Sequence, residues 1–208
     1  MLDNFALLNE ARRPWLEAEP LKQKFLALSS AIHPDRSHEA GAAEREAATR
    51  RFAELNAAWQ CLREPKERLG HLLELELGAR PADAQDVPPA AMDLFFETGR
   101  ICREADAFLA AKSKTTSPVV KAQMFARGME LAGRLNELRQ VILRRREELL
   151  AELPRLNAAW EAAPVPEAVG AERAAFLPLE LLERIYRMLS YIARWTGQIE
   201  ERVVQLSF

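Results

Sequence analysis

The chain has 208 residues, of which 49% are hydrophobic and 29% charged, and its formal net charge is −2. These values are typical of a globular protein with one or two domains and disfavour a nucleic-acid-binding protein, which would need a basic face. No apolar stretch approaches the roughly 18 residues of a membrane-spanning helix, and no basic and apolar leader pattern opens the chain. We therefore expect a cytoplasmic protein with no membrane partner.

Two short helical patterns fill the first part of the chain. Leu21, Phe25, Leu28 and Ile32 follow the spacing of one helix face and predict a helix of about three turns, opened by Pro20 at its first position. A second stripe of the same kind ends before Pro65 and contains Ala48, Phe52, Leu55, Trp59 and Leu62. Two such stripes predict an antiparallel helical hairpin, closed at its ends by the apolar segments 5–8 and 69–75.

The tripeptide His33-Pro34-Asp35 falls between these two helices. Pro34 disfavours the α conformation at His33, so we expect the first helix to end there and the tripeptide to lie on the hairpin tip. Asp35 offers an acceptor carboxylate, His33 an imidazole that can donate and accept, and Pro34 fixes their relative direction. An arginine of a partner could pair with Asp35. The alternative interpretation is a plain helix-ending loop.

The two cysteines and the histidines bear on whether the chain holds a metal ion or an iron–sulfur cluster. Cys61 and Cys102 each lie in a helical apolar pattern, so we expect both to be buried and unpaired. Since an iron–sulfur cluster usually takes four thiolates, we expect no cluster, and no further ligand stands at suitable spacing beside His33 and His38. We predict no metal site and no cofactor, and we expect His71 at the surface or its boundary.

The second half begins after a segment rich in proline, alanine and aspartate, residues 78–89, which predicts a linker. Helical patterns then run from Pro89 to about Lys112, from Pro118 to about Leu153, and from Leu177 to Leu206. Pro154 should kink or stop the middle helix. Three amphipathic helices predict a bundle, and the chain as a whole is expected to be all-α.

Several segments together resemble the HscB family of J-domain co-chaperones, which act in iron–sulfur cluster assembly. The segments are "FALLNEA", "FLALSSAIHPDR", "FAELNAAWQCLREPKERLGHLLEL" and the ending "LLERIYRMLSYIARWTGQIEERVVQLSF". The resemblance implies a J domain in residues 1–77, a linker in 78–89 and a C-terminal three-helix bundle in 90–208. The stretch from about Pro154 to Phe176 looks longer than is usual in that family.

The resemblance also implies two protein partners. The J domain would bind a DnaK-class ATPase chaperone and stimulate its ATP hydrolysis through His33, Pro34, Asp35, Arg36, Lys22 and Lys24. The bundle would bind the scaffold protein on which the cluster is built through Met92, Asp93, Phe95, Phe96, Glu97, Arg187 and Met188. No catalytic motif is visible, so we expect no enzymatic activity, and we expect a monomer.

Three observations keep alternatives open. Gly99 and Arg100 stand where the resemblance implies more carboxylates, and only scattered charges accompany Lys22 and Lys24. A methionine and two phenylalanines at helical spacing are often core, although adjacent residues point roughly 100° apart on a helix and cannot both face inward easily. The alternatives are a J-protein with a different client and a helical adaptor that stimulates no ATPase.

Overall fold

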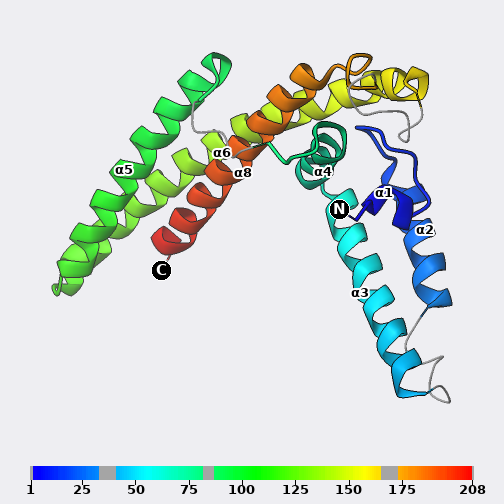
Figure 1. The fold of residues 1–208 in the computed structure, drawn as a ribbon. Helices are drawn as coiled ribbons and strands as arrows, with labels where there is room; N and C mark the ends of the chain where they lie inside the picture. The colour runs from blue at the N-terminus through cyan, green and yellow to red at the C-terminus, as the bar shows by residue number, and fades with distance from the viewer. Residues whose placement is uncertain (1, 33–40, 82–86, 165–172, 208) are drawn as a thin grey trace. The chain divides into compact units, whose positions relative to one another are not determined.

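The computed structural model describes residues 2–32, 41–81, 87–164 and 173–207, and these residues form helices and their connections without a strand (Figure 1). The all-α prediction is confirmed. Among the helices so described, none is long and apolar enough to cross a membrane. The elements are α1 (Asn4–Leu7), α2 (Ala18–Ala31), α3 (Ala42–Arg63), α4 (Pro65–Leu77), the 3-10 helix η2 (Pro89–Ala91), α5 (Met92–Lys114), α6 (Pro118–Ala162) and α8 (Leu179–Ser207).

The chain packs into two compact units. The first unit consists of Met1–Ala82 and Leu150–Tyr186, and the second of Asp83–Leu149 and Arg187–Phe208. The long helices α6 and α8 therefore contribute residues to both units. The domain boundaries predicted from the sequence, 1–77, 78–89 and 90–208, stay predictions.

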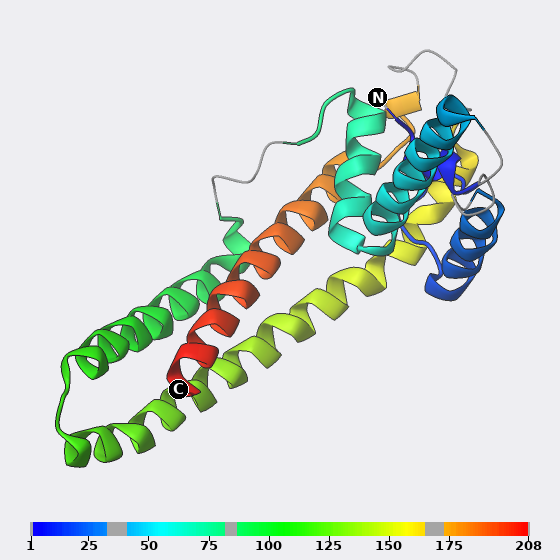
Figure 2. The same ribbon diagram turned by 90° about the horizontal axis from the view of Figure 1, so that it is seen from below.

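Helices α2 and α3 lie side by side and antiparallel, as Figures 1 and 2 show. The rings of Phe25 and Trp59 stack with their centroids 5.0 Å apart, and Leu21 is buried on the same side of α2. On α3 the buried side chains are Leu55, Ala58 and Leu62. The hairpin predicted from the two apolar stripes is thus present.

Helix α2 begins two residues before the predicted start, because Pro20 is its third residue and not its first. A proline is accepted anywhere in the first turn, where the backbone N–H groups have no helical partner. The helix ends at Ala31, and the predicted end at His33 lies outside the described residues. Pro65 opens α4, and Gly78 ends it with φ of 81°, a left-handed conformation that glycine adopts without strain.

Helix α4 lies at the centre of the first unit. Leu69, Leu72 and Leu73 are fully buried. Arg68 is buried with them, and its guanidinium donates hydrogen bonds to the carbonyl oxygens of Pro14, at 2.9 Å, and Leu62, at 2.7 Å. Burial lowers the pKa of Arg68 to about 10. This side chain links the segment before α2 to the end of α3.

His71 is buried, which makes its predicted place at the surface or boundary wrong. The backbone N–H of Asn4 donates to its Nε2 at 3.1 Å, and the ring stacks on Phe5. Its Nδ1 lies 3.8 Å from Glu74, and burial lowers the pKa of the imidazole. The leucine and glutamate pattern of α4 gave no sign that α1 covers this side of the helix.

Helix α6 does not stop at Pro154 but continues to Ala162, contrary to the end predicted near Leu153. Contacts beyond the proline offset the helix hydrogen bond that it removes. The backbone N–H of Trp15 donates to Oδ1 of Asn157 at 2.9 Å, and Nδ2 of Asn157 donates to the Trp15 carbonyl at 3.1 Å. Trp160, one turn further, is buried.

A second contact joins the end of this longer stretch to α4. Arg173 donates to both carboxylate oxygens of Glu76, at 2.9 and 3.2 Å, and the two side chains are only 5% and 3% exposed. Arg173 also donates to the carbonyl oxygen of Pro164. The described residues of the stretch from Pro154 to Phe176 are therefore an integral part of the first unit.

The second unit is built from α5, the first part of α6 and the last part of α8. Of the apolar stripe predicted on the last helix, this unit buries Met188, Ile192, Trp195, Ile199 and Leu206, and Val203 is half-buried. The stripe members Leu181, half-buried, and Ile185, buried, belong to the first unit. Charged pairs link the three helices at their rims. Glu104 of α5 pairs with Arg134 of α6, Glu200 of α8 with Arg139 of α6, and Asp106 of α5 with Arg202 of α8.

Candidate protein-binding surfaces

The tripeptide His33-Pro34-Asp35 and Arg36 lie outside the described residues. What the structure describes is the pair of helices that the tripeptide connects. Helix α2 ends at Ala31 and α3 begins at Ala42. In the sequence the tripeptide falls between these two helices, and its position on the hairpin tip stays a prediction.

The two lysines predicted to bind a chaperone have different surroundings. Lys22 is exposed, and its ammonium group lies 4.0 Å from Glu19. Lys24 pairs with Glu10 at 2.8 Å and donates to the carbonyl oxygen of Asn9, a residue with φ of 52° in the turn after α1. Because the side chain of Glu10 is only 5% exposed, Lys24 fastens α2 to that turn, whereas Lys22 is available to a partner.

The first turns of α5 present a cluster of aromatic side chains. Phe95 is 40% and Phe96 60% exposed, and their rings meet edge to face with centroids 5.5 Å apart. Met92, one turn earlier, is half-buried. The alternative that the methionine and the two phenylalanines belong to the core does not hold for the phenylalanines, since both reach solvent. An exposed aromatic pair beside a methionine is typical of a surface that binds protein.

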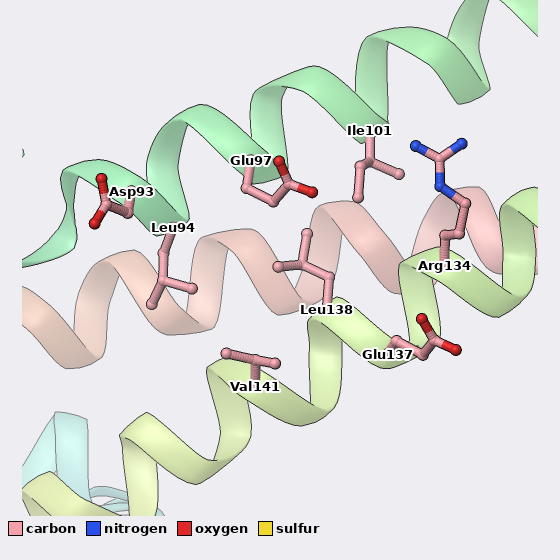
Figure 3. Close-up of a pocket in the computed structure, with 8 residues that line it drawn as sticks. All are labelled: Asp93, Leu94, Glu97, Ile101, Arg134, Glu137, Leu138 and Val141. Carbon is pink, nitrogen blue, oxygen red and sulfur yellow. The ribbon is translucent and has the colours of Figure 1, made fainter.

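A groove between α5 and α6, with a volume of about 420 Å³, lies on the same part of the unit (Figure 3). We call it the α5–α6 groove. Its apolar lining comes from Leu94, Ile101, Leu138 and Val141, and its polar lining from Asp93, Glu97, Arg134 and Glu137. Three carboxylates and one guanidinium line the groove, so it suits a partner with a basic group beside an apolar side chain.

The charge of this groove is reduced by neighbouring arginines. Arg100 donates to both oxygens of Glu97, at 2.6 and 3.0 Å, and these hydrogen bonds lower the pKa of that carboxyl. Arg134 pairs with Glu104 at 2.9 Å. Among the described residues, Asp93 and Glu137, both exposed, are the carboxylates of the groove that form no ion pair with an arginine.

The predicted site residues on α8 are not part of this groove. Arg187 is exposed, whereas Met188 is 5% exposed and packs inside the unit. The groove residues that the sequence did not predict as site residues are Leu94, Ile101, Arg134, Glu137, Leu138 and Val141. Glu137 and Val141 are one turn apart on α6, so the sequence alone shows that they share a face of that helix. Which residues of α5 lie opposite them depends on the register between the two helices, which the sequence does not show.

Comparison with known proteins identifies the fold. No family model matches the chain. Among solved structures, the chaperone HscB from Vibrio cholerae is similar with a TM-score of 0.54 and 20% identity over 99% of both chains. The human co-chaperone HscB is similar with a TM-score of 0.59 and 17% identity over 98% of this chain and 81% of that one. The chain thus has the all-α fold of HscB structures along nearly its whole length.

Proposed function

We propose that this chain is a cytoplasmic co-chaperone that joins a DnaK-class ATPase chaperone to an iron–sulfur cluster scaffold protein. The observation that carries the proposal is the coincidence of an HscB-like fold with a His-Pro-Asp tripeptide in the connection between α2 and α3. The role is one of binding, and the ATP hydrolysis belongs to the chaperone.

The chaperone contact would centre on Asp35 and His33. A carboxylate on a short connection can form a charge-assisted pair with an arginine of the chaperone, which is the kind of contact that shifts a switch between two states. Lys22 would add one positive charge. Lys24 contributes less because Glu10 already neutralises it.

The scaffold contact would use the exposed aromatic pair and the α5–α6 groove together. Phe95 and Phe96 supply apolar surface, and Asp93 and Glu137 supply carboxylates on its rim. Such a surface favours a partner segment with apolar side chains next to lysine or arginine. Two contacts on one body need not be individually strong, since joining them raises the effective concentration of the second partner.

The test of the chaperone contact is the steady-state ATPase rate of the DnaK-class chaperone from the same organism, measured with the wild type and with His33→Gln. We expect the wild type to raise the rate and the variant to leave it at the basal level. Lys22→Ala is the variant for comparison on α2. We expect it to lose only part of the ATPase stimulation, and we expect this loss to be smaller at high salt. Equal stimulation by the wild type and His33→Gln would contradict the proposal.

A second candidate is a J-protein with a different client, and the neutralisation of Glu97 by Arg100 favours it. Calorimetric titration of the scaffold protein into the wild type and into Phe96→Asp separates the two. Saturable binding that Phe96→Asp abolishes supports the scaffold as client. ATPase stimulation without scaffold binding supports a different client, and the absence of both supports a helical adaptor.

A further inference from the structure

The beginning of α6 carries a second apolar stripe, separate from the buried one. Its larger members are all exposed: Val119 by 67%, Phe125 by 60% and Met129 by 50%. The smaller members, also exposed, are Ala122, Ala126 and Gly133. We call these six residues the outer α6 stripe. At 1.5 Å per residue it extends about 21 Å along the helix.

The outer α6 stripe faces away from the other helices of its unit. At roughly 100° per residue, it lies on the side of α6 opposite the buried Leu131, Leu135 and Leu138. The α5 side of the helix is marked by Arg134, which pairs with Glu104, and the α8 side by Arg139, which pairs with Glu200. Among the described residues of the second unit, no other helix covers this third side.

The shape of the stripe suits another helix. Phe125 and Met129 stand beside small residues, and a Cβ atom added at Gly133 would meet nothing within 4 Å. Ridges made by larger side chains and hollows made by small ones are the features by which helices pack closely. A partner helix could therefore approach the backbone of α6 near Gly133 and lie alongside Phe125.

The chain segment around the start of the stripe carries only positively charged side chains. From Ala107 to Met129 the sequence contains no aspartate or glutamate but includes Lys112, Lys114, Lys121 and Arg127. Arg127 is already paired with Glu104 and Glu130. Within the described ranges, none of the three lysines has a carboxylate partner, so they remain available to one supplied from outside.

We propose that the outer α6 stripe binds an amphipathic helix of a partner protein, whose apolar face spans about four turns and whose carboxylates gather at the end that meets Lys112, Lys114 and Lys121. An anionic membrane is the less favoured occupant. Helices that lie on membranes carry basic residues along their whole polar face, whereas these lysines gather at one end of the stripe. The inference does not rest on the chaperone function proposed above.

The experiment uses the full chain and a synthetic 16-residue fluorescent helix with leucines on one face and four glutamates at one end. Fluorescence anisotropy measures its affinity for the wild type and for Phe125→Asp combined with Met129→Asp. We expect the double variant to weaken binding at least tenfold, since central apolar anchors carry much of the energy of an interface. Charge reversal of the three lysines to glutamate should weaken binding strongly at low salt and less at high salt.

Phe96→Asp is the matched control, because it removes an equally exposed phenylalanine from a different surface and should leave peptide affinity unchanged. Circular dichroism checks that each variant keeps its helices. Equal peptide affinity in the wild type and the Phe125 and Met129 variant would overturn the proposal. So would binding to phosphatidylserine vesicles without binding to the peptide, or self-association of the wild type in sedimentation that the double variant abolishes.

Discussion

Each of the two units of this protein is stabilised internally by a different kind of contact. In the first unit, buried polar groups connect segments far apart in sequence, as Arg173 and Glu76 do, whereas in the second unit an apolar seam is flanked by partly exposed ion pairs such as Arg202 with Asp106. Among the described residues, the second unit exposes Phe95, Phe96 and Phe125, whereas the first unit exposes one phenylalanine, Phe176. The difference indicates that the first unit depends on a few specific links, while the second exposes more aromatic surface, which we propose binds partners.

Breaking the buried ion pair should give the largest effect on stability. Arg173→Ala leaves the carboxylate of Glu76 buried without its partner, which typically costs about 3–5 kcal/mol. We expect a clear loss of stability in urea unfolding, with faster hydrogen exchange in α4 and in residues 150–164. Arg202→Ala removes a more exposed pair in the second unit and should cost about 1 kcal/mol or less.

A double variant separates the charge from the packing at this position. Arg173→Met with Glu76→Leu removes both charges and keeps apolar volume, so it should recover most of the stability lost by Arg173→Ala. Equal losses in Arg173→Ala and Arg202→Ala would show that the two units do not differ in the way described.

Removing the side chain of Asn157 should have the next largest effect. Asn157→Ala breaks two hydrogen bonds to the backbone of Trp15 and leaves partly buried groups unsatisfied, at a cost of about 1–3 kcal/mol. The control is Asn136→Ala in the second unit, whose amide donates only to Ala132 within the same helix. If the control costs as much as Asn157→Ala, the link to Trp15 is not what supports α6 beyond Pro154.

The smallest stability effect should come from His71 and depend on pH. Burial lowers its pKa in the folded protein, while Asp3 and Glu74 act in the opposite direction and Arg12 in the same one. A depressed pKa means that the neutral imidazole favours the folded state, so this contribution is present above the ordinary value of 6.5 and is lost as pH falls below it.

The matched variant for this pH effect is His71→Gln, which has no titratable group. We expect the stability of the wild type, followed by urea midpoints between pH 8 and 5, to fall more steeply with acid than that of the variant. Parallel pH profiles for the two proteins would show that His71 is not protonated differently in the folded and unfolded states.

The sequence predicted those features that depend on local spacing. The seam Leu131, Leu135 and Leu138 repeats at steps of four and three, and all three side chains are buried.

The features that the sequence did not predict depend on tertiary contacts. The local rule for Pro154 favours a helix end, but the hydrogen bonds of Asn157 with Trp15, 142 positions apart, support the continued helix. His71 is buried because α1 covers it, and no periodicity in α4 reports that. The α5–α6 groove needs the register of two helices, so only Asp93 and Glu97 of its lining were among the predicted residues.

The most direct test of the account measures two activities on two variants, one for each proposed partner surface. His33→Gln should lose stimulation of the chaperone ATPase and keep scaffold binding, and Phe95→Asp with Phe96→Asp should lose scaffold binding and keep the stimulation. The account predicts that each variant loses one activity and keeps the other. Loss of both activities in each variant, or of neither in both, would contradict it.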